Sequence, residues 1–364
     1  LESSKDIDYP YYFDESQAVR VINFIQLLPH TKGKWASKRQ NLTLEPWQQF
    51  IVGVIFGWLK KSDNLRRFIE AYVEVARKNG KSIVFAAIGL YMMLADNEFG
   101  AEVYSGASTE KQAWEIFRPA RLMAKRTPAL MQKYDIEANA SNLLRLEDYS
   151  RFEPLIGNPG DGASPSCAIA DELHEHRTPD LYDTMQSGMG SREQPLMLAV
   201  TTAGTNLAGI CYEKRTEVQK ILGGVVEGER VFGIIYTLDD GDDFKDESVW
   251  LKANPNIDIS VSRDYIASQV SSAVRSPSKQ NAIKTKHFNL WSGARSAWLN
   301  MELWNAAADD SLAIEQFLGE DSYVGLDLAV RIDIASRGSL FRREIDGLSH
   351  YYYFPHFYLP EDSI

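Results

Sequence analysis

The sequence is poor in cysteine, has no long apolar run, and carries fewer basic than acidic residues. Its two cysteines, Cys167 and Cys211, are too few for a disulfide framework or a four-thiolate zinc site, so we expect a reducing compartment. The longest apolar runs, Ile51–Leu59 and Ile83–Leu94, are shorter than the ~20 residues that a membrane-spanning helix needs. The first residues also lack the basic and then apolar pattern of a secretory signal. We therefore expect no membrane association.

The charge balance bears on nucleic-acid binding. Lys and Arg number 39 against 50 Asp and Glu, which leaves a formal net charge of −11. A protein that contacts phosphates needs local clusters of Lys and Arg. Arg118, Arg121 and Lys125 recur at helical spacing and form one such cluster. A solvated helix face explains the same pattern, so charge alone does not assign nucleic-acid binding.

The length of 364 residues is enough for about two domains of ~150 residues each. The sequence starts with Leu rather than Met, and its last residues, HFYLPEDSI, show no terminal tail. We expect it to be part of a longer gene product, truncated within its second domain.

Short strands alternate with helical patterns over residues 68–204. Ile69, Ala71 and Val73 alternate with Glu70 and Tyr72, which is typical of a strand. A dozen apolar, helix-favouring residues after position 82 predict a buried helix. This alternation favours a mostly parallel, doubly wound α/β sheet. The other expected strands are Ala101–Ser108, Cys167–Glu172 and Pro195–Gly204, and the other expected helices are Asp6–Leu28, one beginning near Pro46, Lys111–Lys125 and Pro179–Gly188.

The stretch VEVARKNGKS, residues 73–82, has two interpretations. In a phosphate-binding loop, Gly80 permits close backbone approach, Lys81 reaches the β/γ phosphates and Ser82 binds Mg²⁺. Val75 stands where such a loop usually has its first glycine. The alternative is a hairpin, because Asn79-Gly80 is typical of a tight turn between strands. A helical pattern follows instead of a second strand, and this favours the phosphate loop.

The stretch CAIADELHEH would supply the second half of an ATPase site. Asp171 would belong to the Mg²⁺ shell and Glu172 would polarise the attacking water. The alternative is that two acids simply end a strand. His174 and His176 do not share a helix face, so we interpret them as part of a surface loop near the nucleotide. Gln48 could bind adenine, because a carboxamide matches the N6/N7 edge of that base.

These pieces, in this order, resemble the large terminase subunit of tailed bacteriophages, specifically the HK97-like group. The matching stretches run from about residue 40 to the end: LEPWQQF, EVARKNGKS, CAIADELHEH, TTAGTN, WLKANPNI, NLWSGARSAWL and YVGLDLA. The first loop glycine is often absent in this family. The resemblance implies an ATP-driven motor that translocates double-stranded viral DNA into a procapsid, joined to an endonuclease that cuts concatemeric DNA.

The resemblance also implies a fold and its domains. We expect a P-loop NTPase (ASCE/RecA-like) doubly wound sheet, followed by the start of an RNase H-like nuclease domain. The expected boundaries are an N-terminal helical region plus ATPase domain over residues 1–305, a linker over 306–320 and the beginning of the nuclease domain over 321–364.

Roles in the ATPase site follow from the same resemblance. Asn79, Gly80, Lys81 and Ser82 match the phosphate loop, with Arg77 as a sensor or stabiliser of the γ-phosphate. Asp171 matches the Mg²⁺ ligand and Glu172 the catalytic glutamate.

Two further assignments concern coupling between hydrolysis and movement. Thr201 and Thr202 match the coupling motif, although an ordinary strand end explains them too. A ring motor also needs an arginine from the neighbouring subunit, and Arg215 is our choice over Arg177, Arg192 and Arg295.

In the second domain, Asp327 lies within the expected strand VGLDLAV, where a buried acid is costly unless it binds a metal. The resemblance makes it the first carboxylate of a two-metal nuclease site using Mg²⁺ or Mn²⁺, with Asp333 as a possible neighbour. Two antiparallel strands should follow, in SRGSLFRRE and SHYYYFPHFYLP.

The expected cofactors are ATP and Mg²⁺, and the expected partners are double-stranded DNA, the portal protein, the small terminase subunit and other copies of the chain in a ring on the procapsid. The expected location is the cytoplasm of the infected host. Two alternatives stay open: a helicase-like ATPase, and a nucleotide-binding regulatory protein that does not hydrolyse ATP.

Overall fold

A computed structural model describes residues 8–156, 162–293, 304, 306–328 and 334–358. The chain divides into two compact units, Leu1–Leu299 and Asn300–Ile364. No helix in these described ranges is long and apolar enough to cross a bilayer.

An eight-stranded sheet forms the centre of the first unit, in the order β10-β3-β9-β8-β4-β7-β6-β5. Neighbours from β10 to β7 run parallel, whereas β6 pairs antiparallel with β7 and with β5. The doubly wound sheet predicted from the sequence is thereby confirmed. Its strands are β3 (Glu70–Glu74), β4 (Glu102–Ala107), β5 (Ile136–Ala138), β6 (Leu143–Arg145), β7 (Arg151–Ile156), β8 (Cys167–Asp171), β9 (Leu196–Thr201) and β10 (Val231–Ile235).

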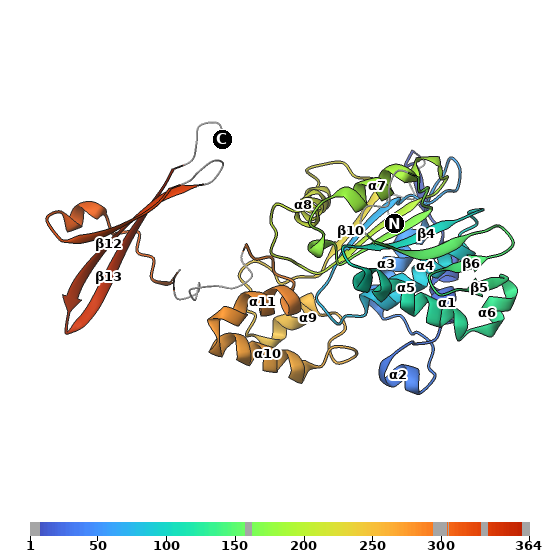
Figure 1. The fold of residues 1–364 in the computed structure, drawn as a ribbon, viewed down its shortest axis with the longest axis horizontal. Helices are drawn as coiled ribbons and strands as arrows, with labels where there is room; N and C mark the ends of the chain where they lie inside the picture. Colours follow the sequence, from blue (N-terminus) through green and yellow to red (C-terminus); the bar gives the residue numbers. More distant parts are fainter. Residues whose placement is uncertain (1–7, 157–161, 294–303, 305, 329–333, 359–364) are drawn as a thin grey trace. The chain divides into compact units, whose positions relative to one another are not determined.

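Helices cover both faces of this sheet (Figure 1). One face packs against α1 (Glu15–Gln26), α3 (Pro46–Gly57), α4 (Lys81–Leu94) and α5 (Glu110–Lys125) through a large apolar core. The other face packs against α7 (Asp180–Gly188) and α8 (Ile210–Leu222). Because both faces are covered, every residue of β3, β8 and β9 is buried.

A separate helical group follows the sheet: α9 (Trp250–Ala253), α10 (Arg263–Arg275) and α11 (Pro277–Phe288). The sequence patterns did not identify it. It has its own core around Trp250 and Phe288, and Figure 1 shows it as a cluster apart from the helices that flank the sheet. This group contacts the loop after β3, as described below.

The remaining elements of the first unit are short. Pro46 begins α3 at its first position, as predicted, and Glu45 caps the helix. The other elements are β1 (Tyr11–Phe13), β2 (Trp58–Lys60), α2 (Gly33–Ser37), α6 (Pro128–Lys133) and the 3₁₀ turns η2 (Leu173–Glu175), η3 (Met189–Ser191) and η4 (Glu247–Val249).

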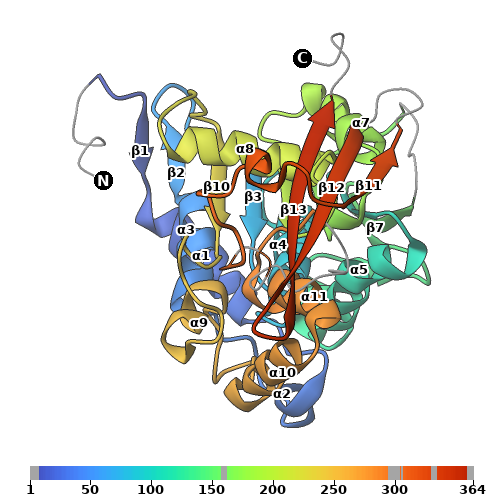
Figure 2. The ribbon, with the colours of Figure 1, turned by 90° about the vertical axis from the view of Figure 1, so that its left-hand side faces the viewer.

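The second unit is an antiparallel sheet of β11 (Ser322–Asp327), β12 (Ala335–Ile345) and β13 (Leu348–Tyr358), drawn in red in Figure 2. The predicted antiparallel strands are confirmed. A 3₁₀ turn, η5 (Ile314–Phe317), places Phe317 against Phe341 and its neighbours on the sheet. Phe317 falls within the segment 306–320 that we interpreted as a linker; the domain boundaries themselves stay a prediction.

The prediction that Asp327 is buried is wrong. All six residues of β11 are exposed. β11 belongs to a three-stranded sheet, and no other described element covers its side chains.

Candidate functional site

The loop that joins β3 to α4 has the geometry of a phosphate loop rather than of a hairpin. A helix follows it at Lys81, and β3 pairs in parallel with both neighbours, which excludes the hairpin interpretation. Gly80 adopts a left-handed φ of +85°, and a Cβ there would lie 3.3 Å from Nε2 of Gln48. Glycine is therefore required by both conformation and space. Val75 is fully buried and contributes to the core instead.

The Lys81 side chain is buried at the centre of the site. Its Nζ donates hydrogen bonds to the Val75 carbonyl (2.9 Å) and to Oγ1 of Thr202 (2.6 Å). Burial lowers the pKa of Lys81, while the negative charges of Glu172 and Asp171 act in the opposite direction. The ammonium group thus joins the loop to the end of β9.

The two acids of the ADE stretch, Asp171 and Glu172, lie at the carboxyl end of β8. Asp171 is the last residue of β8 and is only 2% exposed. Burial, helped by the negative charge of Glu172, raises the pKa of Asp171. Glu172 has a left-handed φ of 47°, which is unusual for a residue with a side chain, and its backbone N–H donates to Oδ1 of Asp171. Such local strain is typical of functional sites.

His174 was interpreted as part of a surface loop near the nucleotide; it does lie beside Glu172, but its side chain is not at the surface. Its side chain is 8% exposed, with Nδ1 lying 3.0 Å from Oγ1 of Thr201 and 3.3 Å from Oε2 of Glu172. Oγ1 of Thr202 lies 3.5 Å from the same Glu172 oxygen. His176 is buried as well, against the Asp171 carbonyl. The signal available in the sequence was the position of His174, three residues after the acid that ends the buried strand β8.

Arg77 lines the cavity that also borders Lys81 and Glu172. Its backbone N–H donates to the Lys286 carbonyl of α11. Its Nε is buried and makes no hydrogen bond to any described residue. A buried guanidinium nitrogen without a partner is costly, and a phosphate oxygen would satisfy it.

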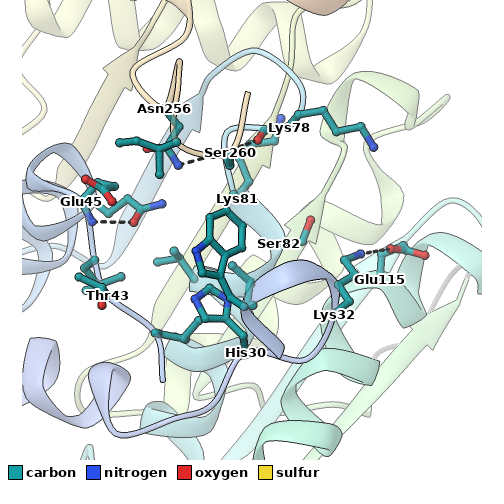
Figure 3. Close-up of a pocket in the computed structure, with 18 of the residues that line it drawn as sticks. His30, Lys32, Thr43, Glu45, Lys78, Lys81, Ser82, Glu115, Asn256 and Ser260 are labelled. Atoms are coloured by element: carbon teal, nitrogen blue, oxygen red, sulfur yellow. Dashed lines mark hydrogen bonds and ion pairs between the residues drawn. The ribbon is translucent and has the colours of Figure 1, made fainter. Parts of the chain in front are cut away.

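The Asn79 side chain points away from the cavity and is fully buried. Its Nδ2 donates to Oδ1 of Asn254 (3.2 Å), and its Oδ1 accepts from the backbone N–H of Asn256 (3.0 Å). In Figure 3, Ser260 also contacts the loop at the Lys78 carbonyl. The segment WLKANPNI thus fastens the loop to the helical group, so the side chain of Asn79 positions the loop. The sequence patterns missed this contact because its partners lie about 175 positions apart.

Seven of the predicted site residues line one open cavity of about 940 Å³. Gln48 lies beside Gly80, and its Oε1 accepts the backbone N–H of Glu45 in the cap of α3. Figure 3 shows Lys81, Ser82 and Glu115 around the hollow. The predicted site residues that line it are Gln48, Arg77, Gly80, Lys81, Ser82, Asp171 and Glu172.

The residues present fit a Mg²⁺-nucleotide. The Ser82 hydroxyl and the Asp171 carboxylate are oxygen ligands of the type that Mg²⁺ prefers, and they line the same cavity as the Lys81 ammonium. The buried Nε of Arg77 and the left-handed Gly80 complete an anion-binding environment.

Arg215 does not lie in this cavity. Its Nε is 3.4 Å from Oε1 of Glu74, a fully buried acid at the end of β3. The same carboxylate accepts from Asn289 (3.1 Å) and Trp291 (3.2 Å). Burial raises the pKa of Glu74, and Arg215 opposes that shift. The guanidinium has a partner within its own chain, and its assignment as an arginine finger stays a prediction.

The nuclease residues do not form a metal site in the described part of the chain. Asp327 is exposed at the end of β11, while Asp333 lies outside the described residues, as does Arg295. No cluster of three or more His, Cys, Asp or Glu residues able to hold a metal occurs among those described. One exposed carboxylate is not by itself a two-metal centre.

Comparison with protein families gives two adjoining matches. The model of the terminase large subunit ATPase domain matches residues 46–220, and that of the terminase large subunit endonuclease domain matches residues 226–363. Both belong to one protein, in the order of its domains, and together they span most of the sequence. The chain belongs to the terminase large subunit family.

Individual relatives agree with this family. The chain is 26% identical over 325 residues to the terminase large subunit of Enterobacteria phage HK97, covering 87% of this chain and 61% of that protein. It is 50% identical over 223 residues to protein YmfN of Escherichia coli K12, covering 61% of this chain and 49% of YmfN. The chain therefore spans about half to three fifths of the length of these relatives.

A solved structure supports the fold. The crystal structure of the HK97 bacteriophage large terminase superposes with a TM-score of 0.64 at 24% identity, over 95% of this chain and 69% of that one. The predicted resemblance and fold class are confirmed. As a terminase large subunit, the chain has an ATPase domain and endonuclease-domain residues, which implies the use of a nucleotide and of divalent metal ions. Neither the helicase-like nor the regulatory alternative gains support.

Proposed function

We propose that this terminase protein is an ATP-driven motor that translocates double-stranded viral DNA into a procapsid, and that its endonuclease domain cuts concatemeric DNA. The observation that carries the motor proposal is the buried contact of Lys81 with Thr202, beside Glu172. This contact joins the lysine that would bind phosphate to the end of β9. Glu172, the acid that would activate water, lies 3.5 Å from the same Thr202 hydroxyl.

Residues of this chain have separate roles in ATP hydrolysis. Lys81 and the backbone of the loop bind the β/γ phosphates, and Arg77 offers its unpaired Nε to the γ-phosphate. Ser82 and Asp171 would hold Mg²⁺, which neutralises charge on the phosphates when bound. Glu172 orients the attacking water and accepts its proton.

Coupling to movement begins at Thr202. Lys81 contacts Oγ1 of Thr202 at 2.6 Å, so an ammonium that turns toward a phosphate must weaken this hydrogen bond. The Thr202 hydroxyl then keeps Glu172 as a neighbour, while Thr201 stays in contact with His174. The end of β9 thereby responds to the presence of the γ-phosphate.

The wider setting of the motor is part of the proposal. The cofactors are ATP with Mg²⁺, and Mg²⁺ or Mn²⁺ for the nuclease, where Asp327 is one ligand. The partners are double-stranded DNA, the portal protein, the small terminase subunit and further copies of the chain in a ring. The protein works in the cytoplasm of the infected host, on the procapsid, with the domain boundaries 1–305, 306–320 and 321–364.

Steady-state ATP hydrolysis with and without double-stranded DNA tests the motor. We expect Lys81→Ala to reduce turnover by about 10²–10³ or more, because an electrostatic contact to the reacting phosphates is lost. Lys220→Ala is the matched control, since Lys220 is exposed on α8 and lies outside the cavity. Stimulation by DNA should weaken as salt rises. Equal turnover in both variants would contradict the assignment of the nucleotide site to Lys81. A rate of hydrolysis that does not change with DNA would contradict the proposal of a DNA-translocating motor.

A further inference from the structure

The cavity at the phosphate loop extends well beyond the residues that would bind phosphates. Its volume of about 940 Å³ is that of a site for a whole small-molecule ligand. Its far wall comes from the N-terminal segment between α1 and α3, which the sequence patterns left without a role. In the view of Figure 3, His30 and Thr43 lie on one side of the hollow and Asn256 and Ser260 on the other.

Two aromatic rings in this wall are stacked. The rings of His30 and Trp35 have centroids 5.2 Å apart and planes inclined by 19°. Both residues line the cavity and both are only partly buried. A flat aromatic pair at the edge of a cavity offers a surface on which another aromatic ring can stack.

The pair is held in place by the backbone around it. The N–H of His30 donates to the Gln40 carbonyl, and the N–H of Gln40 donates to the Trp35 carbonyl. A guanidinium nitrogen of Arg126 donates to the His30 carbonyl at 3.1 Å. Burial lowers the pKa of His30, so its imidazole is neutral at pH 7. A preformed surface costs little to order when a ligand arrives. Nζ of Lys34 lies 4.7 Å from the centroid of the Trp35 ring, so a base that stacks on this ring displaces the ammonium group.

The wall between this pair and the phosphate loop has the composition of a base site. Leu42 and Leu44 are apolar, whereas Gln48 contributes a carboxamide. The carboxamide of Gln48 lies beside Gly80, so polar groups and the phosphate loop are adjacent. Carboxamides can hydrogen-bond the edge of a base whose face is stacked elsewhere.

We propose that the His30–Trp35 pair is the platform on which the base of the bound nucleotide stacks. This inference rests on the proposed function, since it places the base of the same ATP whose phosphates lie at Lys81. It assigns a binding role to residues 30–35, upstream of the region matched by the ATPase-domain model, which begins at residue 46.

A comparison of two ligands separates the platform from the phosphate site. We suggest measuring the dissociation constants of a non-hydrolysable ATP analogue and of inorganic tripolyphosphate, which carries phosphates but no base. The variants are Trp35→Ala, Trp35→Phe and the control Phe99→Ala, whose ring is 79% exposed and lies outside the cavity. Thermal unfolding of each variant shows whether it is folded.

We expect Trp35→Ala to weaken the ATP analogue by about tenfold, which corresponds to ~1.4 kcal/mol and lies in the range for loss of one base–aromatic stack. Tripolyphosphate should bind within twofold of wild type, and Trp35→Phe should retain most of the affinity for the analogue. In steady-state hydrolysis the same loss should raise KM and leave kcat unchanged. Phe99→Ala should behave as wild type with both ligands.

Other outcomes would overturn the inference. If Trp35→Ala binds the analogue as tightly as wild type, or loses both ligands equally, the pair only supports the loop and is not a base platform. In that case the proposed function stands, provided that Lys81 is still needed for turnover. A wild-type protein that binds neither ligand would overturn the platform and the proposed ATPase together.

Discussion

The two units contain similar strand ends in opposite environments. In the first unit, the apolar strand CAIAD ends in Asp171; in the second, YVGLD ends in Asp327. Asp171 is 2% exposed on a central parallel strand, whereas β11 is exposed along its whole length. Among the described residues, an acid at the end of a strand meets other site residues where neighbouring strand ends converge. Parallel strands bring their carboxyl ends to one edge, and an antiparallel edge strand does not.

The largest expected effect compares one acid from each unit. Glu172→Gln should keep ATP affinity but lower kcat by about 10²–10⁴, because a general base is lost while the phosphate contacts remain. Asp327→Asn should leave ATP hydrolysis within about twofold, because Asp327 is exposed and does not line the cavity. Steady-state kinetics and nucleotide-binding measurements on both variants check this. Comparable losses of kcat in the two would break the contrast between the units.

The next effect compares aromatic residues. Phe152 is fully buried in β7, so close to α4 that a Cβ on Gly89 would lie 2.6 Å from its ring. Phe152→Ala should cost about 3–5 kcal/mol of unfolding free energy. Tyr351 is 63% exposed on β13, and Tyr351→Ala should cost less than about 0.5 kcal/mol.

Urea denaturation followed by circular dichroism measures both changes. A large cost for Tyr351→Ala would mean that the face of β13 is covered in solution, and the contrast between the two units would then need revision.

A third effect depends on pH. Burial lowers the pKa of His287 in α11 to about 4, below the value of ~6.5 for an unfolded histidine. Above pH 6.5 this histidine is neutral in both the folded and the unfolded chain, so it does not change the free energy of unfolding. As the pH falls from 6.5 toward 4, only the unfolded chain takes up the proton, so stability decreases by up to ~3 kcal/mol. The histidines of the second unit, His350 and His356, are exposed.

Denaturation at several pH values tests this expectation. His287→Asn should flatten the loss of stability between pH 6.5 and 4, whereas His356→Asn should leave the wild-type slope. Identical slopes for wild type and His287→Asn would show that the loss arises from other groups.

The smallest expected effect concerns His174, which lies between Glu172 and Thr201. As a positioning residue, it should influence the chemical step and not ATP binding. We expect His174→Ala to lower kcat by about tenfold, or ~1.4 kcal/mol, with KM unchanged. His174→Asn should recover part of the loss, because a carboxamide can still hydrogen-bond Thr201. A rise in KM without a change in kcat would instead assign His174 to nucleotide binding.

Much of the first unit could be predicted from its sequence. The strands ending near Glu74, Asp171 and Thr201 and the helix starting at Lys81 lie close to where periodicity placed them. Local patterns suffice there because β8 and β9 are nearly continuous apolar runs and β3 shows an alternating pattern. The cluster α9–α11 was missed although Ile266, Val270 and Ala273 recur at helical spacing in α10. Its core combines residues spread over Leu238–Phe288.

The candidate site shows the same division. Gly80 and Lys81 could be recognised because the loop's requirements are local. The roles of Asn254 and Asn256 could not be recognised, because each is defined by contact with Asn79 across the fold. The same holds for Arg215, whose contact with Glu74 joins α8 to β3.

The amino-acid sequence alone determined the order of strands and helices, the loop that can approach a phosphate, and the family. Those properties depend on side-chain period, backbone freedom and short motifs, all of which are local. Only the tertiary structure decided that His174 is inside the site, that Asp327 is exposed, and that His30 and Trp35 border the same cavity as Lys81. Burial and contact are set by which elements pack together, and that depends on the whole chain and not on any single stretch of it.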